Sequence, residues 1–174
     1  TAIHFGMEQY LKGNKEPEID EEYQNFWSGL PKILDQFTEV LWAESPVLDR
    51  FKFTLGCDDI ARVWGADGQG RAWAGAPDII AVVNNKLTLA DLKTSVRPYS
   101  RKWPKDYEKG TKEWRNLLGG YMKFKKTCKQ LAAYDIAIEQ TLGMKVQQAA
   151  VLVSTPERTQ IFKISRGFLN SLRQ

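Results

Sequence analysis

The stretch Gly75–Ser95, GAPDIIAVVNNKLTLADLKTS, decides the fold of this 174-residue chain. Two apolar runs flank Asn84–Asn85, and asparagine tolerates the left-handed backbone conformation that a two-residue hairpin turn requires. Continuing the pairing outward from that turn brings Asp78 opposite Asp91. Lys93 follows Asp91 by two residues, so its side chain lies on the same face. Both faces are mostly apolar, which predicts an interior hairpin covered on both sides.

Two opposed carboxylates in an interior sheet repel each other unless a positive group lies between them. Lys93 is one such group, and a divalent cation is a better one, because Mg²⁺ and Mn²⁺ prefer carboxylate and carbonyl oxygens. A three-residue loop would shift the register and make Asp78 a diagonal neighbour of Asp91. The alternative interpretation is a buried Asp–Lys ion pair in which Asp78 only ends a turn.

Outward from the hairpin, hydrophobic periodicity predicts a single α/β domain over residues 1–174, with a central mixed β-sheet flanked by helices. Helices are predicted at 2–12, 21–43, 112–142 and 166–173, and strands at 46–55, 57–64, 71–83, 86–94, 146–154 and 159–164. Pro31 is expected to kink or split the helix predicted at 21–43.

Composition excludes several classes of protein. Apolar residues make up 43% of the chain and charged residues 26%, and no apolar run approaches the ~20 residues of a membrane span. The two cysteines, Cys57 and Cys128, are too few for a disulfide framework or a four-cysteine cluster, and we interpret them as reduced packing thiols. The first residue is Thr1, so we expect a fragment lacking its native N-terminus. No leader sequence opens the chain, and the expected location is the cytoplasm of a bacterium or a phage-infected cell.

Positive charge is concentrated in one part of the chain. Residues 93–129 hold twelve Lys and Arg against three acids, whereas the whole chain has a net charge of +4. This pattern indicates a polyanion partner, or else a solvated lysine-rich helix. Basic residues alternate with aromatic ones after the hairpin, which is typical of binding to single-stranded nucleic acid. The predicted contacts are Thr94, Ser95, Arg97, Tyr99, Arg101, Lys102, Trp103, Lys123 and Lys126.

Four blocks of the sequence resemble the PD-(D/E)XK nuclease superfamily, and within it the RecB-type exonucleases. They are Thr1–Leu11 with its histidine, Gly75–Asp78, the D-x-K-T-S block in Leu89–Ser95, and the Q-x-x-x-Y helix block in Lys129–Tyr134. The similarity extends to the mitochondrial genome maintenance exonuclease and to CRISPR-associated RecB-like nucleases. The four-cysteine iron–sulfur cluster of the latter is excluded for these 174 residues, which hold two cysteines, and we expect any helicase to be a separate chain.

The resemblance implies a restriction-endonuclease-like core and a site that binds Mg²⁺ or Mn²⁺. Lys93 would orient or deprotonate the attacking water, and Gln130 and Tyr134 would lie on one helix face against the site. Glu44 is expected at the end of the second helix, where it is either a water-mediated metal ligand or a surface glutamate. The implied metal ligands are His4, Asp78, Asp91, the Leu92 carbonyl oxygen and Glu44.

The expected function is a metal-dependent deoxyribonuclease, an exonuclease on single-stranded DNA in recombination, repair or replication. One alternative is a non-catalytic single-stranded DNA-binding domain on the same fold, and another is a structure-specific endonuclease. A helicase or recombination protein on a separate chain is a further expected partner. The sequence does not distinguish the direction of digestion, a preference for DNA over RNA, or one bound metal ion from two.

Overall fold

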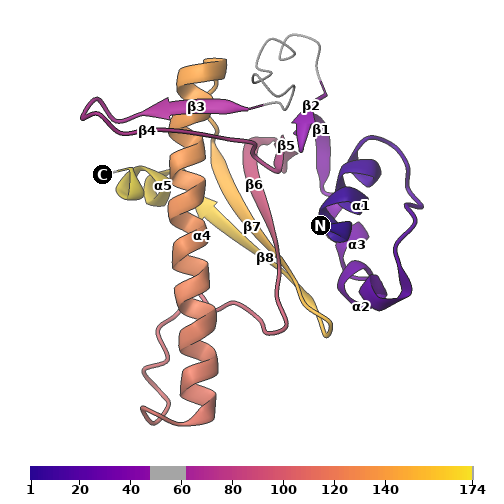
Figure 1. The fold of residues 1–174 in the computed structure, drawn as a ribbon, viewed down its shortest axis with the longest axis vertical. Coiled ribbons are helices and arrows are strands. Elements are labelled where there is room, and N and C mark those ends of the chain that lie inside the picture. Colours follow the sequence, from indigo (N-terminus) through magenta and orange to yellow (C-terminus); the bar gives the residue numbers. More distant parts are fainter. Residues whose placement is uncertain (48–61, 174) are drawn as a thin grey trace.

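A six-stranded mixed sheet forms the centre of the computed structural model, which describes residues 1–47 and 62–173 (Figure 1). The strand order is β2-β1-β5-β6-β7-β8, and only β6 and β7 run parallel. These strands are β1 (Phe37–Ala43), β2 (Ser45–Pro46), β5 (Ile79–Val83), β6 (Lys86–Thr94), β7 (Gln148–Ser154) and β8 (Thr159–Ser165). The predicted α/β class with a central mixed sheet is confirmed.

Helices cover both faces of this sheet. A group of short helices lies on one face, namely α1 (Ala2–Leu11), η1 (Glu21–Tyr23), α2 (Gln24–Trp27) and α3 (Leu30–Leu34). The long helix α4 (Lys112–Leu142) lies on the other face, joined by α5 (Arg166–Leu172). A separate two-stranded sheet of β3 (Val63–Ala66) and β4 (Ala72–Gly75) crosses the C-terminal half of α4 (Figure 1).

The predicted hairpin is confirmed in its turn and its register. Asn84 and Asn85 have φ angles of 50° and 63°, the left-handed conformation that a tight hairpin turn needs. The ladder pairs Val83 with Lys86 and Ile79 with Ala90. Extending this register by one residue brings Asp78 opposite Asp91.

Alternate side chains of the hairpin enter two different hydrophobic cores, as its two apolar faces predict. Ile80 and Leu89 pack with α4 in one core. Ile79, Ala90 and Leu92 pack with α1 and α3 in the other. β5 and β6 are therefore interior strands, and polar groups among them need partners.

The prediction of one helix over residues 21–43 is wrong. Of the two effects expected of Pro31, the structure shows the split: α2 ends at Trp27, and Pro31 lies in the first turn of α3, which ends at Leu34. The following residues, Phe37–Ala43, form β1, which pairs with β5. Pairing with a buried strand therefore outweighs the apolar spacing that favoured a helix.

Other predicted elements differ at their ends or fall outside the described residues. The strand expected at 71–83 is two strands, β4 and β5, which belong to different sheets. Two further strands were expected at 46–55 and 57–64. Most of their residues lie outside the described part of the chain, and so does Cys57.

The long helix at 112–142 is confirmed, and Gly119–Gly120 does not interrupt it. The side chain of Thr111 caps its first turn, and Gly143 ends it with φ 65°. Cys128 is buried in the core beneath α4, and burial raises the pKa of its thiol to about 11, as suits a packing thiol. Among the described helices, none is long and apolar enough to cross a membrane.

Candidate functional site

Asp78 is held in place from three directions. The Trp42 indole donates a 2.8 Å hydrogen bond to the carbonyl oxygen of Pro77, the residue before Asp78. The N–H of Glu44 donates to the Asp78 carbonyl oxygen at 2.7 Å. The N–H of Leu92 donates to Asp78 Oδ2 at 2.8 Å. Both the backbone and the carboxylate are therefore fixed at the point where the chain enters β5.

His4 approaches this carboxylate from the first turn of α1. Thr1 caps the helix, and its Oγ1 lies 2.6 Å from Nδ1 of His4, which fixes the orientation of the ring. The other ring nitrogen, Nε2, lies 3.5 Å from Asp78 Oδ2. Burial disfavours the charged ring, but the hydrogen bond to Asp78 and the charges of Asp78 and Glu44 outweigh it and raise the pKa of His4.

Glu44 completes a cluster with His4 and Asp78. One ligand atom from each of the three side chains lies within 4.8 Å of the other two. Glu44 has φ 59°, a left-handed conformation that is uncommon for glutamate and costs roughly 1–3 kcal/mol, and strain of this kind gathers at functional sites. Its expected place at a helix end is wrong, because it lies at the bend between β1 and β2. Burial, followed by the charge of Asp78, raises the pKa of Glu44 to about 7.

Asp91 and Lys93 extend the cluster along β6. The Asp91 side chain is only 3% exposed, and Lys93 Nζ lies 3.1 Å from its Oδ2. Burial and the charge of Asp78 raise the pKa of Asp91 to about 7, against the opposing effect of Lys93. Lys93 Nζ also donates a 3.0 Å hydrogen bond to Gln130 Oε1 from the middle of α4. These contacts outweigh partial burial and raise the pKa of Lys93.

One buried oxygen atom in this cluster lacks a partner. Among residues 1–47 and 62–173, Glu44 Oε1 accepts no hydrogen bond, whereas the buried Asp91 Oδ2 faces the Lys93 ammonium at 3.1 Å. A buried carboxylate oxygen that remains unpaired is costly, and a cation removes that cost. His4, Glu44 and Asp78 supply two carboxylates and one imidazole, with the Asp91 carboxylate opposite Asp78, and such donors suit Mg²⁺ or Mn²⁺. The residues therefore fit a divalent ion.

The backbone of Leu92 faces the Asp78 carboxylate. Its N–H donates to Asp78, and the N–H and C=O of one strand residue point toward the same neighbouring strand. The carbonyl oxygen that was expected to bind metal is therefore directed to the side of β6 on which Asp78 lies.

Comparisons with known proteins give little further information. No family model matches the chain, and no curated protein matches it. A crystal structure of SSO0001 is similar at 18% sequence identity with a TM-score of 0.32. The similar region covers 63% of this chain and 45% of that protein, so the chain spans less than half of its length. A TM-score this low supports no argument about fold or function.

Tyr134 lies beside the strand that leads into the cluster. The ring of Tyr134 packs so closely on Gly75 that a β-carbon at Gly75 would lie 2.7 Å from it. Tyr134 therefore contacts the segment three residues before Asp78, and it also packs against the core beneath α4. This placement supports a role in positioning Asp78.

The predicted nucleic-acid contacts fall into two groups on the surface. Arg97 and Lys123 line a small pocket with Arg115, and Arg97 donates to the side chain of Asn116. Thr94 and Lys126 are also exposed. In a second group, Arg101 and Lys102 flank the half-exposed Trp103 near Tyr121.

Two of the predicted contacts are largely buried. Tyr99 is 8% exposed and packs in the core beneath α4, so its predicted contact with a nucleic acid is wrong. Ser95 is equally buried, and its Oγ has no accessible surface and no hydrogen bond to a described residue. The Ser95 hydroxyl therefore cannot contact a nucleic acid as predicted, although other atoms of Ser95 line a surface pocket.

The sequence analysis missed two residues that build the site. Thr1 orients His4, and a threonine three residues before the histidine at a helix start was an available signal. Trp42, which anchors Pro77, was assigned to a helix, so nothing indicated its contact with the hairpin.

Proposed function

We propose that this chain is a metal-dependent nuclease of the PD-(D/E)XK type that hydrolyses phosphodiester bonds in DNA, and that its sheet and helices form a restriction-endonuclease-like core. One observation carries the proposal. Lys93 lies between Asp91 and Gln130 beside a cluster of His4, Glu44 and Asp78, in which the buried Glu44 Oε1 accepts no hydrogen bond from a described residue. A purely structural ion pair would need Asp91 and Lys93 alone.

His4, Glu44, Asp78 and Asp91 would hold the ion, with the Leu92 carbonyl oxygen as a further donor. A divalent ion supplies charge neutralisation at the phosphate and lowers the pKa of a coordinated water molecule. Thr1 and the Leu92 N–H keep His4 and Asp78 oriented for this purpose.

Lys93 would act as a hydrogen-bond donor. Partial burial opposes the charged form, but in the metal-free protein the charges of Asp91 and Asp78 outweigh it and raise the pKa of Lys93, which favours the protonated, donating form. Asp91 and Gln130 each hold Nζ on one side, which leaves the remaining proton for a phosphate oxygen or the attacking water. Gln130 would be a positioning residue that acts through Lys93.

The substrate would be a single strand of DNA. Exposed basic residues near the site, including Arg97 and Lys123, would follow the backbone, and Trp103 offers an exposed ring. Binding that depends on phosphate contacts weakens steeply as salt rises. Affinity that does not change with salt would count against this substrate.

A digestion assay tests the proposal. End-labelled single- and double-stranded DNA is incubated with Mg²⁺, Mn²⁺ or EDTA, beside the variants Asp91→Ala and Lys93→Ala. Lys86→Ala is the matched control, because Lys86 is exposed at the other end of the same strand. Metal-dependent shortening that both site variants lack and the control retains would support a nuclease.

Circular single-stranded DNA distinguishes an exonuclease from an endonuclease, because an obligate exonuclease leaves a circle intact. Salt-sensitive strand binding without any cleavage would instead favour a non-catalytic DNA-binding domain.

A further inference from the structure

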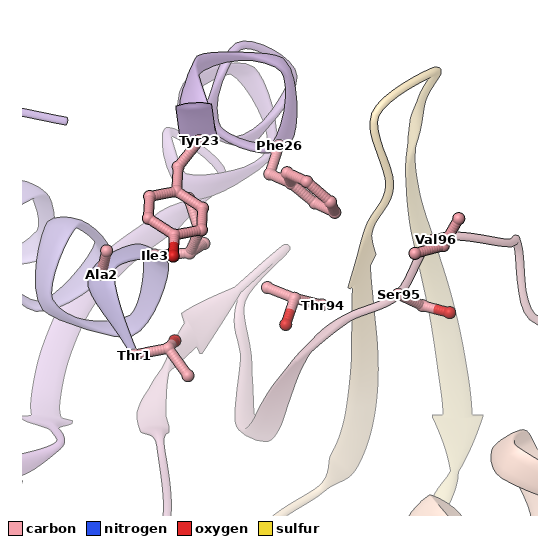
Figure 2. A pocket seen from close by; sticks show the side chains of 8 residues that line it. All are labelled: Thr1, Ala2, Ile3, Tyr23, Phe26, Thr94, Ser95 and Val96. Atoms are coloured by element: carbon pink, nitrogen blue, oxygen red, sulfur yellow. The ribbon is translucent and has the colours of Figure 1, made fainter. Parts of the chain in front are cut away.

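An apolar pocket of about 350 Å³ opens beside the candidate site. One wall comes from Thr1–Ile3, which directly precede His4, and another from Thr94–Val96, which directly follow Lys93. The third wall is the pair of rings of Tyr23 and Phe26. Figure 2 shows the Tyr23 ring beside Ala2 and Ile3 of α1 and the Phe26 ring nearer the end of β6, with Thr94 below both. The pocket thus begins one residue from His4 on one wall and one residue from Lys93 on another.

The chemistry of the pocket differs from that of its surroundings. Its lining holds two aromatic rings, aliphatic side chains and hydroxyl groups, and no charged side chain. Arg97, the first basic residue of the loop, follows directly after Val96 and is exposed. A neutral aromatic pocket that begins one residue from Lys93 suits a ligand that is planar in one part and anionic in another. Its volume lies within the range of pockets that enclose a small planar group.

The aromatic wall is held rigidly. The Phe26 carbonyl oxygen accepts a hydrogen bond from the hydroxyl of Ser154 on β7. The next residue, Trp27, is buried and packs edge-to-face on Tyr10 of α1, with ring centroids 6.0 Å apart. Because the segment is attached to both the sheet and α1, the rings lose little freedom when a ligand enters.

We infer that this pocket receives one unpaired nucleobase of the DNA strand, next to the phosphate that is cleaved. The inference rests on the proposed nuclease function and adds the place where one base of the single strand is held. Stacking on Tyr23 and Phe26 would hold the base, while Lys93 contacts the adjacent phosphate. A paired base has to leave its stack before it enters such a pocket, so occupancy selects single strands or frayed ends over intact duplex.

Substitution of the rings tests the inference with a chemically matched substrate. Phe26→Ala and Tyr23→Ala are compared on a single-stranded oligonucleotide and on the same strand with a tetrahydrofuran abasic residue beside the cleaved bond. Loss of one stacked base weakens binding by about 5- to 100-fold. We expect each variant to raise Kd in that range for the normal strand and by less than about 2-fold for the abasic strand.

The control variant is Phe168→Ala, because Phe168 is a partly exposed phenylalanine on α5, outside the pocket. It should bind both strands as the unsubstituted chain does. Tyr23 is 36% exposed, so Tyr23→Ala keeps the test valid even where Phe26→Ala unfolds the protein. An equal loss on both strands, or no loss on either, would overturn the inference.

A binding measurement separates this inference from the nuclease proposal. 2-Aminopurine is placed at successive positions of the strand, and its fluorescence is measured with the Asp91→Asn variant. Fluorescence quenching at one position of the strand, lost in the Tyr23→Ala, Asp91→Asn double variant, supports the pocket. This result does not require that the unsubstituted chain cleaves DNA. Cleavage without position-specific quenching would refute the pocket and leave the nuclease proposal standing.

Discussion

The N–H of Leu92 donates a 2.8 Å hydrogen bond to Asp78 Oδ2, so a central strand fixes the orientation of a carboxylate on its neighbour. Asn at position 78 can still accept this bond through its amide oxygen, but it carries no negative charge. We therefore expect Asp78→Asn to fold with a free energy of unfolding within about 1 kcal/mol of the original. The variant should lose the rise in melting temperature that Mn²⁺ gives to the unsubstituted chain.

Differential scanning calorimetry with and without Mn²⁺ measures both quantities. Glu157→Gln is the control, because Glu157 is an exposed acid in the turn between β7 and β8. Equal stabilisation of Asp78→Asn and the unsubstituted chain by Mn²⁺ would remove Asp78 from the metal site.

The stability of the metal-free protein should depend on pH in a definite direction. Glu44 and Asp91 each have a pKa of about 7, well above that of an unfolded carboxylate. Between about pH 5 and pH 8 the folded state holds protons that the unfolded state has lost, so stability falls as pH rises. The raised pKa of His4 acts in the same direction, since its stabilising effect is lost as the ring deprotonates.

Melting temperatures in EDTA and in Mn²⁺ across this range check the prediction. The EDTA curve should fall with pH and the Mn²⁺ curve should lie increasingly above it, because the ionised carboxylates bind the ion. Glu44→Gln should flatten the EDTA curve. A metal-free melting temperature that rises from about pH 5 to pH 8 would contradict the assignment.

Lys93 should matter for the chemical step more than for folding. Lys93→Met keeps the length of the side chain and removes the donor, and we expect kcat to fall by about 10²- to 10⁴-fold. Gln130→Ala should reduce kcat by roughly 10-fold, because it frees Lys93 Nζ on one side only. Gln130→Glu, which retains an acceptor for Nζ, should recover part of that loss. Single-turnover cleavage rates distinguish these outcomes from changes in binding.

The hairpin was predictable because its signals are local. Asn84–Asn85 fix the turn, and the alternation on either side fixes which side chains share a face, so the proximity of Asp78 and Asp91 followed from register. The long helix was predictable for the same reason, with Thr111 at its start and Gly143 at its end.

Contacts between distant segments were not predictable. Phe37–Ala43 has apolar spacing that suits a helix, and only its pairing with β5, more than 35 residues later, makes it a strand. The bend that places Glu44 beside Asp78 depends on that strand. The burial of Tyr99 was unpredictable for the same reason. It depends on packing beneath α4, and the alternation of basic and aromatic residues carries no information about that contact.

A buried ion pair outside the site should dominate the stability of the C-terminal half. Asp135 on α4 is fully buried, and Arg166 of α5 donates to its Oδ1 at 2.8 Å while Arg173 Nε lies 3.3 Å from its Oδ2. Asp135→Ala leaves the Arg166 guanidinium partly buried without its partner, which costs about 3–5 kcal/mol. Glu139→Ala, one turn later, removes an exposed partner of Arg173 and should shift the urea midpoint far less. Similar midpoints for the two variants would contradict this assignment.

Two adjacent glycines in α4 should respond to alanine with opposite signs. A β-carbon at Gly119 meets no atom within 4 Å, so Gly119→Ala should raise the free energy of unfolding by about 0.5–1 kcal/mol through the better helix propensity of alanine. A β-carbon at Gly120 would lie 2.6 Å from the carbonyl oxygen of Pro98. That oxygen belongs to backbone, which cannot swing aside as a flexible side chain does, so Gly120→Ala should lower the free energy by about 1–3 kcal/mol. Urea unfolding of the two variants measures the difference directly, and changes of the same sign would show that the loop after β6 does not pack on α4 as described.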